Sequence, residues 1–190
     1  MFLFVRVLLL AALIATAIWA WEERSMRSFG VFLTSLAGFI GAELKVRAGH
    51  GKQDDRLLAD RQLFARLREA MPTDSIHFLK THDFGASFRI QEFIVLDRFQ
   101  LSWDAADHIF HDRILEGQRR RLVKLVRALA WEIATNTWSA GEGSQGVPHE
   151  WAHEQPERLE KVRDSLNQKS SKVAALAEDL IKTGKKRLHV

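Results

Sequence analysis

Cysteine is absent from this chain of 190 residues, and tyrosine is absent as well. Without cysteine the chain has no disulfide bonds, no thiolate metal ligands and no cysteine nucleophile. Such a composition suits a reducing compartment like the cytoplasm. The aromatic residues are supplied instead by 6 tryptophans and 12 phenylalanines. We therefore expect Phe and Trp side chains to provide the aromatic packing of the core.

Common catalytic and nucleotide-binding signatures are also missing. The sequence has no phosphate-binding loop that ends in Lys-Ser or Lys-Thr, no dinucleotide fingerprint and no nucleophile elbow around Ser139 or Ser144. The 28 basic and 24 acidic residues give a net charge of only +4, which indicates a surface of mixed charge. We therefore predict a non-enzymatic protein without a cofactor and expect no duplex nucleic acid partner.

Charge is scarce in the first 46 residues, which we interpret as a membrane anchor. Residues 1–21 carry one charged side chain, Arg6, and residues 29–42 carry none. Because about 20 apolar residues span the hydrocarbon core of a bilayer, the first block predicts a transmembrane helix; a cleaved signal peptide is the alternative. The second block, rich in glycine, predicts a second span that completes a helical hairpin. A re-entrant or interfacial helix and a first core helix of the soluble domain are the alternatives.

Basic residues on either side of these blocks predict the orientation of the anchor. Arg6 precedes the first block, Arg24 and Arg27 lie in the connector, and five basic residues occur between Lys45 and Arg61. Because Lys and Arg favour the cytoplasmic side, both termini are expected in the cytoplasm. We therefore predict an inner-membrane protein that contacts lipid and holds its soluble domain in the cytoplasm.

The rest of the chain predicts a linker over residues 47–54 and a helical domain over residues 55–190. Apolar residues recur close to every 3.6 positions through most of this domain, and Pro72 ends the first helix. We predict helices over residues 55–71, about 74–82, 88–103, 106–138 and 156–183, with a loop over residues 139–147. Ser87 is the expected N-cap of the third helix, and Gly184 is the expected C-terminal stop of the last. The predicted fold is all-α, an antiparallel helical bundle preceded by a transmembrane helix or hairpin.

A basic patch on the longest predicted helix is a candidate ligand site. It consists of Arg119, Arg120, Lys124 and Arg127, with Arg121 beside them. Guanidinium groups at this spacing suit the phosphate of a nucleotide, a nucleic acid or a lipid head group. An ordinary solvated helix face is the alternative. A second basic cluster, at Lys182, Lys185, Lys186 and Arg187, is either a lipid-adsorbing segment or an ordinary basic helix end.

Residues 149–153 match the His-Glu-x-x-His pattern of zinc peptidases. In that pattern His149 and His153 would hold the metal, while Glu150 would polarise a bound water. Pro148 and Pro156 leave room for only about two helical turns, and Glu178 is the nearest candidate third ligand. The alternative is an exposed segment that precedes the last helix.

A second group of possible metal ligands contains His108 and His111, together with Asp104, Asp107 and Asp112. Histidines three positions apart on a helix can share a metal ion. Acidic residues at a helix N-terminus also interact favourably with the helix dipole. A structural helix cap is therefore the alternative to a metal site here.

Three segments give residues 60–188 a resemblance to known proteins. They are His82-Asp83-Phe84-Gly85, Leu96-Asp97-Arg98-Phe99 with Trp103, and residues 147–151 leading into residues 154–158. This stretch resembles a family of small helical bacterial proteins of unknown function. The resemblance implies a helical module that occurs in different contexts, here joined to a membrane anchor, and it implies no active site.

The architecture is also similar to that of membrane effectors of bacterial antiphage defence, a likeness of design alone. We expect a membrane-anchored sensor or interaction module that forms a homo-oligomer and binds a nucleotide, another phosphate-bearing ligand or a protein partner. The alternatives are a membrane-tethered zinc-dependent hydrolase that uses His149, Glu150 and His153, and a structural membrane scaffold.

Overall fold

The computed structural model describes residues 2–23 and 26–190, with side chains left out of the description at residues 2–6, 20, 23, 26–29 and 42–52. The chain divides into two compact units, residues 1–55 and residues 56–190. The described chain is mostly helical and carries one small three-stranded sheet. The helical fold class predicted from the sequence is therefore correct, while the sheet was not predicted.

The first unit contains helix α1, Phe2–Glu23, and the N-terminal part of helix α2, Met26–Ala70. Hydroxyl groups in this unit bond to their own helices, since Thr16 Oγ1 donates to the carbonyl of Ala12 at 3.0 Å and Thr34 Oγ1 donates to that of Gly30 at 2.6 Å. Within the part of the chain that the structure describes, no helix has the length and apolar character needed to cross a membrane. The predicted hairpin also involves residues 1, 24 and 25, which lie outside the described residues, and it stays a prediction.

The linker expected over residues 47–54 does not interrupt the helix. Helix α2 continues through these residues and ends at Ala70, just before Pro72. Proline restricts the residue before it to extended conformations, which explains why the helix ends there. Gly49 and Gly51 weaken a helix without breaking it, because each costs only about 1 kcal/mol relative to alanine.

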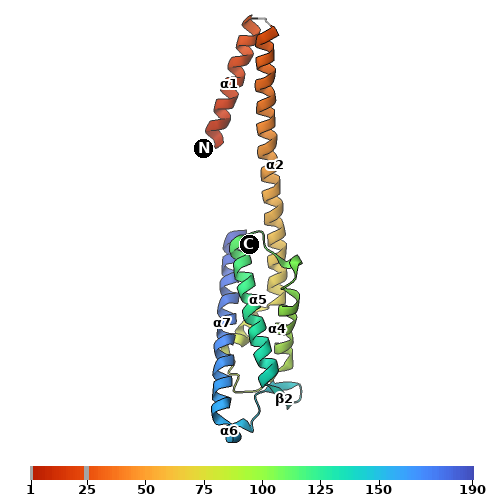
Figure 1. The fold of residues 1–190 in the computed structure, drawn as a ribbon, viewed down its shortest axis with the longest axis vertical. Coiled ribbons are helices and arrows are strands. Elements are labelled where there is room, and N and C mark those ends of the chain that lie inside the picture. Colours follow the sequence, from red (N-terminus) through yellow and green to blue (C-terminus); the bar gives the residue numbers. More distant parts are fainter. Residues whose placement is uncertain (1, 24–25) are drawn as a thin grey trace. The chain divides into compact units, whose positions relative to one another are not determined.

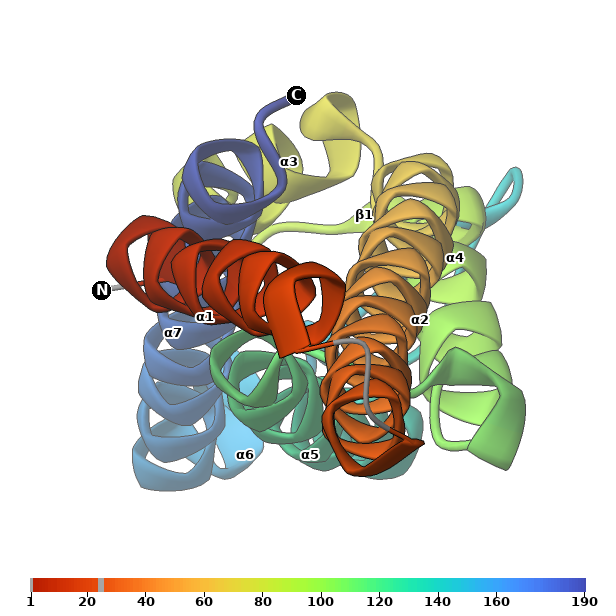
Figure 2. The ribbon, with the colours of Figure 1, turned by 90° about the horizontal axis from the view of Figure 1, so that it is seen from above.

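The second unit is a bundle of antiparallel helices (Figures 1 and 2). Its elements are the C-terminal part of α2, α3 (Thr73–Thr81), β1 (Phe88–Arg89), α4 (Ile90–Ser102), η1 (Ala106–His108), α5 (Arg113–Asn136), β2 (Trp138–Gly141), β3 (Ser144–Gly146), α6 (Trp151–Glu154) and α7 (Pro156–Leu188). Helix α5 packs against α4 on one side and α7 on the other, and α3 packs against α7. The end of α7 lies beside the start of α5, where Arg187 Nε donates to Asp112 Oδ2 at 2.7 Å. Helices α5 and α7 therefore run antiparallel.

Two helix starts differ from the predictions because other groups fix them. Helix α5 begins at Arg113, and not near residue 106, because the carboxylate of Asp112 accepts the backbone N–H groups of Ile114 and Leu115 at 2.9 and 3.1 Å. Helix α4 begins at Ile90, and Ser87 is not its N-cap, because Phe88 and Arg89 form strand β1. An aspartate cap and a strand pairing therefore decide where these helices begin.

Helix α7 does not stop at Gly184, as the sequence suggested, but continues to Leu188. A Cβ atom at position 184 would lie 2.7 Å from two ring carbons of Phe64, so glycine is needed for the close approach of that ring. His189, in the left-handed conformation at φ 56°, ends the helix instead.

The loop predicted over residues 139–147 contains a β-hairpin. Strand β2 pairs antiparallel with β3, and β3 pairs antiparallel with β1, which gives the strand order β1-β3-β2. The turn uses three consecutive residues with positive φ, Gly141 (88°), Glu142 (46°) and Gly143 (73°). Glycine at the first and third positions makes this turn accessible. The sheet thereby connects the start of α4 to the segment between α5 and α7.

The core of the second unit is closed and rich in aromatic side chains, as the composition led us to expect. Trp103 stacks on Phe99 with 5.6 Å between ring centroids, and both side chains are almost fully buried. Aliphatic side chains from α5 and α7, including Leu122, Leu129 and Leu180, complete the interior. The helical unit therefore has its own hydrophobic core.

Candidate functional site

The basic face of α5, formed by Arg120, Lys124 and Arg127, is exposed to solvent. These residues follow the spacing i, i+4 and i+7, which places them on one side of the helix. The opposite side of α5 carries Leu122, Val126, Leu129 and Ile133, all buried. These three cations therefore lie together on one exposed face of the helix, and we call them the α5 basic face.

Arg119 does not belong to this surface, although the sequence placed it in the patch. It is only 4% exposed, and its guanidinium forms two hydrogen bonds of 2.8 Å with the carboxylate of Glu116. A further N–H donates to the backbone carbonyl of Trp103 at the end of α4. Arg119 thus joins α4 to α5 inside the protein and cannot meet a surface ligand.

Glu116 holds both the buried and the exposed arginine. Its Oε1 atom also accepts from Nε of Arg120 at 2.6 Å, and its Oε2 atom accepts the backbone N–H of Phe110 at 3.1 Å. Burial alone would raise the pKa of Glu116, but the hydrogen bonds from Arg119 and Arg120 outweigh it and leave the pKa below its ordinary value. The carboxylate is therefore ionised at neutral pH and holds the guanidinium of Arg120 through its Nε atom.

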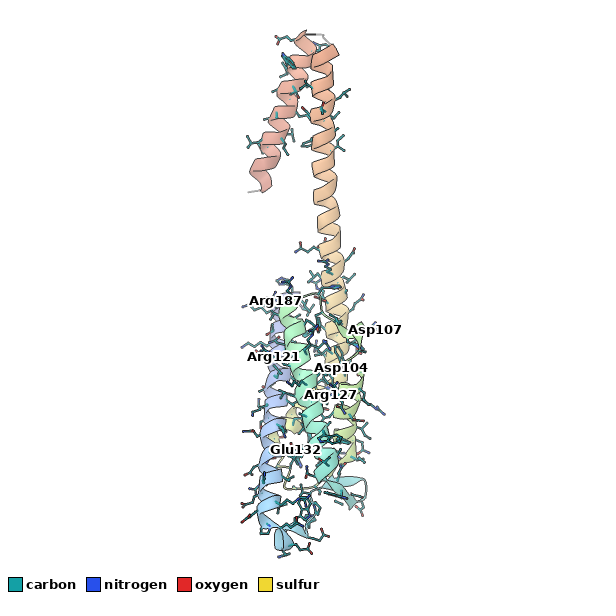
Figure 3. All side chains as sticks on the ribbon, viewed as in Figure 1. Asp104, Asp107, Arg121, Arg127, Glu132 and Arg187 are labelled. Atoms are coloured by element: carbon teal, nitrogen blue, oxygen red, sulfur yellow. The ribbon has the colours of Figure 1, made fainter. Side chains whose placement is uncertain are left out.

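Arg127 is fixed in a similar way by an acidic residue from another element. Its NH2 group forms an ion pair of 2.6 Å with Asp104, which follows α4, and Figure 3 labels the two side chains beside each other. Both side chains are more than half exposed, so the pair contributes little stability. Its effect is to orient the guanidinium at the surface.

Lys124 lies between these two arginines along the face. It is exposed and, among the described residues, forms no ion pair. The α5 basic face therefore presents two oriented guanidinium groups with an ammonium group between them. Such a set can bind phosphate oxygens.

One exposed residue on this side of α5 was not singled out from the sequence. Trp131 is 72% exposed and lies eleven residues after Arg120, so it extends the same face by one further turn. In the sequence, the spacing i, i+4, i+7 and i+11 from Arg120 to Trp131 already indicates that these residues share one helix face.

The zinc pattern follows the C-terminal end of α5 and the β-hairpin, and its geometry does not support a metal site. His149 and Glu150 precede the single turn of α6 and His153 lies within it, and all three are exposed. Glu178, the proposed third ligand, is 22 residues into α7, which corresponds to about 33 Å of helix. In the described chain no group of three or more His, Asp or Glu side chains is placed to hold a metal.

Trp151 is the buried residue of this segment. Its ring contacts that of Trp138 edge to face at 5.7 Å, and the guanidinium of Arg158 lies 3.8 Å from its centroid. A cavity of about 540 Å³ lies between this segment and strand β2 and is lined by both tryptophans, His149 and Glu150. The contacts of Trp151 dock α6 and the start of α7 against the hairpin.

The second predicted metal cluster is dispersed among structural roles. The Asp112 carboxylate caps α5, the backbone N–H of His111 donates to Asp60 Oδ1 at 2.7 Å, and Asp104 pairs with Arg127. His108 packs against Trp103 with 4.6 Å between ring centroids. The helix-cap interpretation is therefore correct for Asp112.

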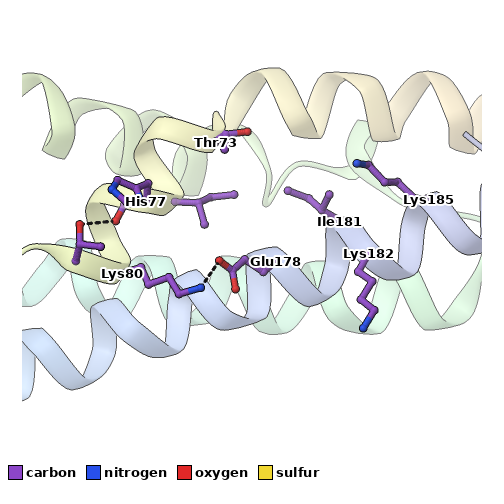
Figure 4. A pocket seen from close by; sticks show the side chains of 9 residues that line it. Thr73, His77, Lys80, Glu178, Ile181, Lys182 and Lys185 are labelled. Atoms are coloured by element: carbon purple, nitrogen blue, oxygen red, sulfur yellow. Dashed lines mark hydrogen bonds and ion pairs between the residues drawn. The ribbon is translucent and has the colours of Figure 1, made fainter.

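A groove of about 870 Å³ lies on another side of the bundle, between α3 and α7. In Figure 4, Lys80 of α3 reaches across to Glu178 of α7, an ion pair of 2.7 Å, and Ile181 faces the space between the helices. From the C-terminal basic cluster, Lys182 and Lys185 line the groove, whereas Arg187 pairs with Asp112. The groove thus lies apart from the α5 basic face. One of the lysines that line it, Lys80, is already engaged in an ion pair.

His82 is a titratable group that packs against three phenylalanine rings. Its ring stacks on Phe78 at 4.7 Å and meets Phe84 and Phe88 edge to face, and its Nε2 atom is buried without a partner among the described residues. Burial lowers the pKa of His82 below 6.5, although the Ala86 backbone partly opposes this shift. The side chain is therefore neutral at pH 7 and forms part of the packing.

Compared with known proteins, the chain matches no family model, no curated protein and no solved structure. The resemblance to a family of helical bacterial proteins therefore stays a prediction. The candidate site rests on the geometry of the α5 basic face alone.

Proposed function

We propose that this chain is a membrane-anchored helical interaction module without enzymatic activity. Residues 1–46 would form the anchor, and the helical unit would bind a phosphate-bearing ligand or a protein partner on the α5 basic face. The charge distribution of the sequence supports an inner-membrane location with both termini in the cytoplasm.

The observation that supports an anchor is that α1 exposes large apolar side chains in several directions. Val7, Leu8, Leu9 and Leu10 are consecutive, so together they face every direction around one helical turn, and each is between 40% and 58% exposed. Fully burying a side chain of this size contributes roughly 1.5–3 kcal/mol. A helix that is apolar on all sides is typical of a large protein interior or a membrane. Since the chain leaves about half of each of these side chains uncovered, we assign lipid as their covering.

Self-association of the anchor is supported by the glycines of α2. Gly30, Gly38 and Gly41 fall on one broad side of the helix, and a Cβ atom built on any of them meets no atom within 4 Å. Small residues let membrane helices approach closely. This side of α2 is open to a second copy of the chain, as the homo-oligomer proposal requires.

The ligand-binding part of the proposal is supported by the fixed arginines. Arg120 and Arg127 each spend one donor group on a carboxylate, and a guanidinium has five N–H donors. Most of these donors therefore remain for a ligand, while the side-chain direction is already fixed. Such preorganisation reduces the entropy lost on binding.

The anchor is tested by adding charge to α1. In the full chain, Leu10→Arg with Ile14→Arg should shift the protein from the carbonate-resistant membrane fraction to the soluble or aggregated fraction. Leu101→Arg is the matched control, because Leu101 is 71% exposed but lies on α4, and this variant should stay in the membrane. Unchanged membrane retention of the α1 variant would refute the assignment of α1 to the anchor.

The binding face is tested by charge reversal. Arg120→Glu with Lys124→Glu should abolish binding to a phosphate affinity matrix and leave the helical content unchanged. The control, Lys161→Glu with Lys172→Glu, makes the same change of net charge at exposed positions of α7 and should bind normally. Equal binding by both double variants would remove the α5 basic face from the proposal.

A further inference from the structure

Trp131 gives the α5 basic face an aromatic surface beside its cations. Along the helix axis it lies about 6 Å from Arg127, about 10 Å from Lys124 and about 16 Å from Arg120. Its ring is 72% exposed, whereas Trp103 and Trp151 are buried in the core. The face therefore combines one accessible indole with three cations in a single row.

An indole beside cations suits a ligand that carries both an aromatic ring and phosphates. Nucleobases stack on tryptophan, and phosphate oxygens accept from guanidinium and ammonium groups. Arg127 is the cation nearest to Trp131, and only its NH2 group is engaged by Asp104. Its other N–H donors are directed at no protein acceptor among the described residues.

We infer that the α5 basic face together with Trp131 binds a nucleotide, with the base stacked on the indole and the phosphates held by Arg127 and Lys124. This inference rests on the proposed phosphate-binding function and adds the ligand class. Arg120, at the far end of the row, would contact a terminal phosphate or a following nucleotide.

The composition of the face favours a nucleotide over an acidic lipid surface. A helix that lies on a membrane needs a broad apolar side that enters the bilayer. On α5 the apolar side faces the core, and within residues 120–131 Trp131 is the one large apolar side chain that is exposed; Ile114, also exposed, lies at the start of the helix outside this row. One indole among cations offers stacking and charge, but little area for insertion.

The test compares adenosine triphosphate with inorganic tripolyphosphate, since the two share a triphosphate and differ in the base. The full chain, held in discs of uncharged phosphatidylcholine, should bind adenosine triphosphate more tightly in isothermal titration. Trp131→Ala should weaken that binding about 10- to 100-fold and leave tripolyphosphate binding unchanged. Trp131→Phe should retain most of the affinity, because phenylalanine also stacks.

The outcomes separate this inference from the function on which it rests. Equal affinity for the two probes, unaffected by Trp131→Ala, would overturn the nucleotide assignment and leave a plain phosphate site. Binding of neither probe, with no adsorption to vesicles that contain phosphatidylglycerol, would overturn both the nucleotide assignment and the phosphate-binding function. A further outcome is a chain that binds neither probe and adsorbs to vesicles that contain phosphatidylglycerol. Loss of this adsorption in Trp131→Ala would show that the face binds acidic lipid. The Arg120→Glu, Lys124→Glu variant should lose both probes.

Discussion

Replacing Glu116 with alanine should destabilise the helical unit far more than removing any surface ion pair. The carboxylate accepts two hydrogen bonds from Arg119, one from Arg120 and one from the backbone of Phe110. Without it, Arg119 keeps its charge at 4% exposure with only the Trp103 carbonyl as a partner. Removing one member of a buried ion pair typically costs about 3–5 kcal/mol.

For a domain of this size, that loss corresponds to a fall in Tm of roughly 10–20 °C. The assay is thermal unfolding of the full chain in mild detergent, followed by near-ultraviolet circular dichroism, because the stacked and buried Trp103 reports on the core. The matched control is Glu178→Ala, which breaks the exposed pair with Lys80 and should cost at most about 1 kcal/mol.

The pH dependence gives a second measurement at the same residue. Because the pKa of Glu116 is lowered in the folded state, its contribution is fully present above its ordinary pKa of 4.5. That contribution is lost as the pH falls through the lowered pKa. Glu116→Gln should therefore flatten the acid side of the stability curve. A shift in Tm for Glu116→Ala no larger than that of Glu178→Ala would refute the reasoning.

Three further predictions concern packing, pH and the turn. Gly184→Ala should lower the free energy of unfolding by about 1–3 kcal/mol, because the added Cβ atom clashes with Phe64. Gly117→Ala should raise it by up to about 1 kcal/mol, because a Cβ atom there has no described neighbour within 4 Å and alanine favours the helix; denaturant titrations measure both changes. Because the pKa of His82 is lowered, stability should fall as the pH drops below 6.5, and His82→Phe should remove this dependence from Tm measured between pH 5 and 7.5. Glu142→Gly should stabilise the hairpin by several tenths of a kcal/mol, since φ is 46° there; a loss of stability would contradict the strain argument.

The helices of the second unit could largely be predicted because their apolar residues repeat with the helical period. The hairpin could not, because all four residues of β2 are exposed and no alternating pattern marks the strand. The partner of β3 on the other side, β1, lies more than 50 residues earlier in the sequence. Two glycines around Glu142 were the local signal, and they are equally compatible with a loop.

Errors at single positions have the same origin in distant contacts. Gly184 resembles a helix stop in sequence, but the ring of Phe64 from α2 explains why glycine occurs inside α7. The predicted patch contained Arg119, whose burial depends on the Trp103 carbonyl of another helix. Its partner Glu116, three residues earlier, was a local sign that one arginine in the row is already paired.

The two arginines that share Glu116 make the surface and the interior respond to each other. A phosphate that draws Arg120 away from Oε1 leaves the whole carboxylate to Arg119 and the backbone of Phe110. If the proposed ligand displaces Arg120 in this way, the free energy of binding would include a change in the strength of the α4–α5 connection. By reciprocity, any event that tightens or loosens that connection changes the affinity of the outer face by the same factor.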